Sequence, residues 1–210
     1  MVDLVDLDAL SLADYRRNVS DIYYKVRRSG SSPEERWRRF CQERDRLFKQ
    51  HPQSALTPAQ RAGFTGLRYY PYNPALRFQL PIEPQAEAAE IQVDLQADGI
   101  TRLLPFGKIH FEVEGQPVAL TLYWMLGYGG GIFLPFRDLT SQSETYGGGR
   151  YLLDTIKGAD LGREGDRLVI DFNFAYNPSC AYQPRWRCPL APKENWLEVP
   201  IRAGELNYAE

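Results

Sequence analysis

The chain has 210 residues, a length typical of one domain, and its 43% hydrophobic and 25% charged residues are those of a soluble globular protein. The formal net charge of −2 gives no overall attraction to nucleic acid or to anionic membranes, so neither is an expected partner. The first eight residues are acidic and lack the basic and apolar regions of a secretory signal, which predicts a cytoplasmic protein.

One uncharged run, residues 115–136, has the length of a membrane span. Glycines at 127 and 129–131 and prolines at 117 and 135 interrupt it. Such residues break helices and mark turns, so the run is better explained as two strands joined by a glycine turn. The sequence therefore predicts no membrane partner.

Two helices are predicted near the N-terminus. Apolar residues of the segment 11–28 recur every three or four positions, which places them along one face of a helix with Ser11 as its N-cap. Ser32 and Glu35 form a capping box with Pro33 at the first helical position, and this second helix ends near His51. A further capping box at 57–60 opens a short helical turn. Arginines on these helices alternate with acidic residues, and without a nucleic-acid module signature they indicate a solvated surface rather than a phosphate-binding face. The arginines considered are Arg16, Arg17, Arg27, Arg28, Arg36, Arg38 and Arg39.

Beyond residue 67 the apolar residues alternate with a period of two, which is typical of strands. Strands are expected over residues 77–80, 91–95, 101–104, 108–113, 118–124, 131–134, 150–153, 168–174 and 196–199. Glycine-rich turns separate them without helical periods between, so the predicted fold class is α+β, with N-terminal helices packed on a mainly antiparallel barrel or sandwich of about eight strands. The helical segment is placed at 1–66 and the β domain at 67–210, together one structural unit.

Polar side chains are concentrated at residues 171–177. If this segment continues as a strand, Asp171, Asn173 and Asn177 share one face and Tyr176 lies on the other. Asp and Asn are poor strand formers, so this face indicates a ligand-lined wall or a structural polar network. Both alternatives stay open on the sequence.

Glycines at 147–149 precede Arg150, and they match neither a phosphate-binding loop nor a dinucleotide fingerprint. Their amides with Arg150 could form an anion-binding nest. The alternative is that the glycines supply the positive φ angles of a hairpin or bulge, and this is the preferred interpretation.

Metal and cofactor chemistry finds little support. Cys180 and Cys188 are separated by seven residues, which does not fit the spacing of a zinc knuckle, and the two histidines are His51 and His110, the latter expected to face solvent. Paired thiols are preferred over a hairpin disulfide or a metal site, and no metal or cofactor is predicted. The scarcity of histidine also disfavours triad catalysis. Acid–base chemistry remains open through Asp138, Asp171 or Glu194.

Several segments together resemble an uncharacterised prokaryotic family, domain of unknown function 1684. They are residues 135–140, 145–152, 171–182, 188–195 and 201–205, supported by Trp37, Arg44, Asp45, Leu47, Phe48 and by residues 51–52 and 67–72. The resemblance implies a prokaryotic, cytoplasmic protein whose motifs gather at one site, and it assigns no role to any residue.

The preferred hypothesis is a binding protein for a small polar or anionic molecule, held in a pocket of the β domain. The expected lining residues are Arg137, Tyr146, Arg150, Asp171, Asn173, Tyr176 and Asn177. Two alternatives are an enzyme that uses the carboxylates named above in the same pocket, and a structural or interaction module whose polar side chains bond to backbone.

Overall fold

The computed structural model describes residues 9–85, 89–95 and 99–208. Three helices come first, α1 (Ala9–Arg28), α2 (Pro33–Gln50) and α3 (Pro58–Gly63). The strands that follow are β1 (Arg77–Leu80), β2 (Glu83–Pro84), β3 (Ile91–Asp94), β4 (Ile100–Val113), β5 (Gln116–Leu126), β6 (Gly131–Phe136), β7 (Arg150–Asp154), β8 (Arg163–Glu164) and β9 (Arg167–Asp171). Short 3-10 turns are η1 (Pro74–Leu76), η3 (Thr155–Lys157), η4 (Phe172–Phe174), η5 (Ser179–Ala181) and η6 (Lys193–Asn195).

The strands form two antiparallel sheets. The larger has the order β2-β4-β5-β6-β7, with β3 also paired to β4, and the smaller has the order β1-β9-β8. Apolar side chains from both sheets share one core, in which the Phe172 ring contacts Phe78, Phe111 and Phe136. Among the described residues the sheets do not close into a barrel, so the sandwich alternative of the predicted α+β fold is the one confirmed.

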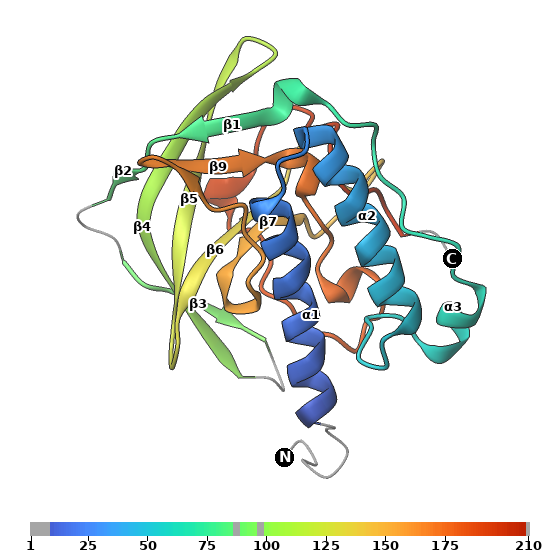
Figure 1. Ribbon diagram of the computed structural model, residues 1–210. Coiled ribbons are helices and arrows are strands. Elements are labelled where there is room, and N and C mark those ends of the chain that lie inside the picture. The colour runs from blue at the N-terminus through green and yellow to red at the C-terminus, as the bar shows by residue number, and fades with distance from the viewer. Residues whose placement is uncertain (1–8, 86–88, 96–98, 209–210) are drawn as a thin grey trace.

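Helices α1 and α2 lie against each other and pack on one side of the strands (Figure 1). The Phe40 side chain of α2 is fully buried, with its ring centroid 5.3 Å from that of Tyr23 in α1 and 4.9 Å from that of Phe174 in η4. A single aromatic cluster therefore joins both helices to the β region, because each helix presents its apolar stripe to it.

The predicted capping boxes are confirmed. Ser32 Oγ accepts from the Glu35 amide at 3.3 Å while the Glu35 carboxylate accepts from the Ser32 amide at 3.0 Å, and Thr57 and Gln60 repeat the arrangement at α3. The prediction for α1 was wrong at its start, since this helix already includes Ala9 and places Ser11 inside its first turn. Ala9 and Leu10 are strong helix formers, which explains the longer helix.

Two strand predictions are corrected. Residues 101–104 and 108–113 belong to one strand, β4, whose pairing with β5 shifts register between Pro105 and Gly107. A Cβ at Gly107 would lie 2.5 Å from Ile82 Cγ2, so the lack of a side chain at this irregularity lets the segment with Ile82 pack closely against β4. Residues 196–199 form no strand. An isolated bridge joins Trp196 to Arg137, and the Val199 carbonyl accepts from the Leu139 amide at 3.2 Å.

The most informative correction concerns residues 171–177. Strand β9 ends at Asp171, and residues Phe172–Phe174 turn as a 3-10 helix, so the alternating polar face was wrong. Asp171 Oδ1 accepts from the Asn173 amide at 3.0 Å and from Asn173 Nδ2 at 2.7 Å. An Asp side chain that bonds to the backbone two residues on competes with the strand ladder, and here it ends the strand.

Across the described ranges, no helix has the length and apolar character needed to cross a membrane.

Candidate functional site

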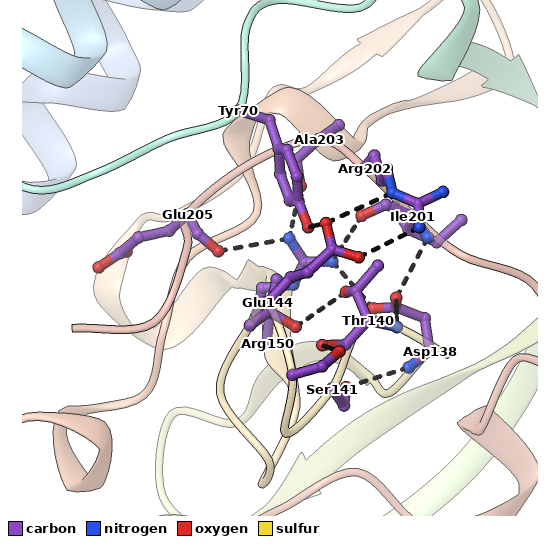
Figure 2. A network of polar contacts seen from close by, with 12 residues as sticks. Tyr70, Asp138, Thr140, Ser141, Glu144, Arg150, Ile201, Arg202, Ala203 and Glu205 are labelled. Carbon is purple, nitrogen blue, oxygen red and sulfur yellow. Dashed lines mark hydrogen bonds and ion pairs between the residues drawn. The ribbon is translucent and has the colours of Figure 1, made fainter. Parts of the chain in front are cut away.

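Arg150 lies at the centre of a buried polar network rather than at a pocket (Figure 2). Its side chain is fully buried, and Nη2 donates to Asp138 Oδ2 and to the Ile201 carbonyl, both at 2.9 Å. Nη1 donates to the carbonyls of Ala203 at 2.5 Å and Glu205 at 3.4 Å. The Arg150 guanidinium on β7 thus hydrogen-bonds to three carbonyls of the C-terminal segment, those of every second residue from 201 to 205.

Asp138 is held within the same network. Its Oδ1 accepts from the amides of Thr140 at 2.8 Å and Ile201 at 3.1 Å, while Oδ2 faces Arg150. Next to it, the Glu144 carboxylate accepts from Tyr70 Oη at 2.9 Å and pairs with Arg202 at 3.1 Å (Figure 2). These contacts occupy the carboxylate oxygens that would have to accept or release a proton in acid–base catalysis.

The glycines before Arg150 shape a turn. Gly149 has φ +88° and its amide donates to the Tyr146 carbonyl at 2.9 Å. A Cβ at this position would lie 2.4 Å from the Phe136 carbonyl oxygen. The geometry supports the turn interpretation, because positive φ and close approach to backbone both require glycine here.

Asp171 and Asn173 lie together at the end of β9. Asn173 also hydrogen-bonds to the backbone before β1. Its Oδ1 accepts from the Asn73 amide at 2.7 Å, and its Nδ2 donates to the Asn73 carbonyl at 2.8 Å. Asp171 lines a cavity of about 150 Å³ beside Arg36 and Arg77. Burial raises the pKa of its carboxyl to about 6, although the hydrogen bonds from Asn173 act in the opposite direction.

Two further predicted residues lie at the surface. Arg137 stacks its guanidinium 4.3 Å from the centroid of the exposed Trp196 ring and lines a surface hollow with Asp138. Glu194 is exposed in the turn η6. The structure therefore distributes the predicted site residues over several places instead of one.

Tyr176 and Asn177 line a larger cavity of about 280 Å³, which has α1 and α2 on one side and the β sheet on the other. Its walls come from segments distant in sequence: α1, α2, the strands β5 to β7, η3, and the C-terminal loops at 176–182 and 187–189. Most of these lining side chains are aromatic or aliphatic. A concave, largely apolar site with a few polar groups is typical of small-molecule binding.

Three lining residues carry buried polar atoms that have no hydrogen-bond partner within the described parts of the chain: Tyr23 Oη, Tyr176 Oη and Asn177 Oδ1. Leaving a buried hydroxyl or amide oxygen unpaired costs about 1–3 kcal/mol, so such groups are rare in folded proteins. All three residues line this one cavity.

Charged side chains also line this cavity. Arg44, Lys157 and Arg187 line it together with a single carboxylate, Asp154. Lys157 Nζ lies 2.6 Å from Asp154 Oδ2, and although burial alone would lower the pKa of Lys157, this pairing raises it. Lys157 therefore stays protonated in the physiological pH range.

Arg44 links several residues of the cavity wall. Its Nη2 donates to Glu205 Oε2 at 2.7 Å, its Nε donates to Tyr69 Oη at 3.0 Å, and its guanidinium lies 5.1 Å from the centroid of the Tyr176 ring. Glu205 accepts in addition from Tyr182 Oη and from the Asn177 amide. Because this ion pair is buried and hydrogen-bonded on both sides, it fixes α2 against the C-terminal loops.

The sequence interpretation missed Tyr15, Tyr23, Arg44 and Lys157 as cavity residues. Arg44 was among the residues that support the family resemblance, and the hydroxyl groups of tyrosines in the apolar stripe of α1 were a second signal, which by itself is typical of core packing.

The thiol pair lies at the edge of this cavity. Cys41, Cys180 and Cys188 are free, Cys188 lines the cavity, and Tyr146 Oη lies 3.5 Å from Cys180 Sγ. His110 is exposed, as expected, with Nε2 3.0 Å from Glu83. No group of three His, Cys, Asp or Glu side chains suited to a metal ion occurs among the residues that the structure describes.

A family model described as "Protein of unknown function (DUF1684)" matches residues 62–206. The fold is similar to the solution NMR structure of an uncharacterised protein from Haloarcula marismortui, with a TM-score of 0.58 and 32% sequence identity. That match covers 82% of this chain and 93% of the archaeal chain. No curated protein matches the sequence.

Proposed function

The chain belongs to the DUF1684 family of proteins of unknown function, and from this premise we propose that it binds a small organic anion in the cavity between the helices and the β sheet. The observation that carries the proposal is the set of three unpartnered buried polar atoms, on Tyr23, Tyr176 and Asn177, around one cavity. The proposed ligand is still small and anionic, as the sequence suggested, but it must also fit a largely apolar wall.

The size and chemistry of the cavity define the ligand class. A volume of about 280 Å³ is just below the ~300–1,000 Å³ of pockets that hold drug-sized molecules, so the ligand is a small metabolite. Arg44 is paired with Glu205 and Lys157 with Asp154, so Arg187 supplies the remaining positive charge, which favours an anionic group. Asn177 Oδ1 can only accept, so the ligand must also carry a hydrogen-bond donor, and the aromatic wall favours an apolar body.

A native mass spectrum of freshly purified protein tests the proposal without choosing a ligand, and we expect a retained small molecule. Phenyllactate serves as a defined probe, because it combines an aromatic body, a carboxylate and a hydroxyl donor. We expect phenyllactate to raise the melting temperature more than 3-phenylpropionate, which lacks only the hydroxyl, or phenyllactamide, which lacks only the charge.

Two variants locate the binding. Tyr176→Phe keeps the ring that contacts Arg44 and removes only the hydroxyl, so we expect phenyllactate to bind roughly fivefold more weakly for the loss of about 1 kcal/mol. Tyr123→Phe is the matched control, since Tyr123 Oη is also buried and unpartnered within the described chain but Tyr123 does not line the cavity. Equal affinities in the two variants, or no retained mass and no thermal shift with any probe, would exclude this function.

We further propose the cytoplasm as the compartment, supported by three cysteines that are free in the structure.

A further inference from the structure

Cys180 and Cys188 face each other beside the cavity, in surroundings that differ from those of a core cysteine. Their side chains hydrogen-bond to each other, and Tyr146 Oη donates to Cys180 Sγ at 3.5 Å. Both side chains are half-buried, and Cys188 is part of the cavity wall. The two thiols are thus neighbours at the edge of a cavity that a small molecule can enter.

The two thiols are electrostatically unequal. The hydrogen bond from Cys188 lowers the pKa of Cys180 to about 6, assisted by Tyr146 and by the nearby Arg187 and opposed by burial. The same hydrogen bond and burial raise the pKa of Cys188. Near neutral pH the pair therefore holds one thiolate, on Cys180, and one thiol, on Cys188.

We propose that Cys180 and Cys188 form a redox-active dithiol that exchanges with small organic disulfides, with Cys180 as the attacking thiolate and Cys188 as the resolving thiol. The inference goes beyond ligand binding and does not depend on which molecule occupies the cavity.

The exchange proceeds in two steps. Cys180 Sγ attacks one sulfur of a disulfide RSSR, forming a mixed disulfide and releasing one thiolate RS⁻. Cys188 then loses its proton to solvent and attacks Cys180 Sγ, which releases the second RS⁻ and closes the Cys180–Cys188 disulfide. The dithiol is oxidised by two electrons, and RSSR is reduced to two RSH after protonation.

The third cysteine provides an internal contrast. Cys41 lies on α2 against the helical core, and burial raises the pKa of its thiol to about 12. It therefore carries almost no thiolate near neutral pH, and its side chain serves as a small apolar group. Cys41→Ala gives a background in which only the proposed dithiol is titrated.

The test uses dithiobis(nitrobenzoate), an aromatic disulfide whose released thiolate absorbs visible light. In the Cys41→Ala chain we expect two equivalents of thiolate and a product lighter by two hydrogen atoms. With Cys188→Ser added we expect one equivalent and a retained mixed disulfide. With Cys180→Ser added, the reaction at pH ~6 should slow by at least roughly tenfold, because an ordinary thiol with a pKa near 8.5 has far less thiolate there, even after allowing for its greater nucleophilicity.

A pH profile examines the origin of the reactivity. Tyr146→Phe removes the hydroxyl donor, and we expect the midpoint of the reaction rate against pH to move upward, whereas Tyr123→Phe should leave it in place. Other titratable or charged groups that interact with the pair also contribute to the profile, namely Tyr151, Lys157 and Arg187. Asp154 acts on these groups through its ion pair with Lys157.

Peptide mapping of the unsubstituted chain keeps the test decisive if a variant fails to fold. After a substoichiometric dose of the reagent, the first sulfur to react should be that of Cys180, and the disulfide should join residues 180 and 188. First reaction at Cys41 or Cys188, or a stable mixed disulfide on the unsubstituted chain, would overturn the proposal.

Discussion

At the scale of single residues, most buried polar side chains of this protein hold backbone segments together. Asn195 is typical, because its Oδ1 accepts from the Thr121 amide at 2.8 Å and its Nδ2 donates to the Thr121 and Pro135 carbonyls at 2.9 and 2.8 Å. Arg150 does the same for the C-terminal segment. A buried polar group is costly unless it is paired, so loops rich in such residues need these contacts to stay folded.

The hydrogen bonds of Asp171 do not fully offset the effect of burial on its pKa. The free energy of unfolding therefore depends on pH through this carboxyl group. Burial raises its folded pKa to about 6, whereas an unfolded Asp has a pKa near 4. The folded state therefore holds the proton more tightly. The contribution of the protonated Asp171 to the free energy of unfolding is fully present below about pH 4 and is lost as pH rises through about 6. At neutral pH the loss amounts to roughly 2–3 kcal/mol.

Asp171→Asn removes this titration but retains an oxygen that can accept from Asn173. We expect the variant to match the unsubstituted protein near pH 4 and to exceed its free energy of unfolding by roughly 2–3 kcal/mol near pH 7, measured by urea denaturation across the range. Asp166→Asn, at an exposed position between β8 and β9, controls for the loss of one negative charge. A difference between Asp171→Asn and the unsubstituted protein that stays constant with pH would refute the argument.

At the scale of elements, the C-terminal segment is bonded to β7 and to the turn after β9 without being a strand. Its carbonyls at 201, 203 and 205 bind Arg150, and its Glu205 amide donates to the Ala175 carbonyl at 2.9 Å. Gly204 is the point of closest approach, since a Cβ there would lie 2.7 Å from the carbonyl oxygens of Ala175 and Phe172. The segment can dock only because this residue has no side chain.

Gly204→Ala tests that docking, and Gly115→Ala is its control. Both glycines have φ +79°, but nothing lies within 4 Å of a Cβ built at Gly115, in the β4–β5 turn. Both variants bear the strain of a positive φ, about 1–2 kcal/mol, and we expect Gly204→Ala to lose about 1–3 kcal/mol more through overpacking. Thermal or urea unfolding measures the difference, and equal losses would mean that the segment can move aside without cost.

At the scale of the whole molecule, the aromatic cluster around Phe40 predicts that the helical segment 1–66 and the β domain 67–210 unfold together. Phe40→Ala should lower the free energy of unfolding by about 3–5 kcal/mol, while Tyr24→Ala, on the exposed face of α1, should change it by less than about 0.5 kcal/mol.

Hydrogen exchange provides the readout for this coupling. The slowest amides of α2 and of β9 should lose protection by the same free energy in Phe40→Ala, because a cooperative unit opens as a whole. Loss of protection in α2 alone would show that the helices unfold as a separate unit.

Much of the fold could be predicted from the sequence, because the signals are local. The Ser32–Glu35 and Thr57–Gln60 capping boxes act within one helical turn, and alternation of apolar residues marks strands wherever one face is buried. The motifs that resemble DUF1684 were also read directly from residues, and the family match over 62–206 confirms that identification.

The candidate site could be predicted only in part. Tyr176 and Asn177 do line the cavity, but Asp171 and Asn173 end a strand, and Arg150 and Asp138 satisfy backbone groups far away in sequence. Nothing local distinguishes an Asp that binds a ligand from one that accepts from amides, since both need the same polar atoms. The difference depends on which partner the fold brings within 3 Å.

The sequence by itself therefore determined the helix boundaries that caps define, the alternating strands and the family, because each depends on neighbours along the chain. Only the tertiary structure decided the use of the polar residues. It placed α1 and α2 over the β sheet, left three polar atoms unpartnered around the cavity, and brought Cys180 to Cys188 and Tyr146. These outcomes depend on contacts between distant segments, which form only when the apolar stripes of the helices are buried on the sheet.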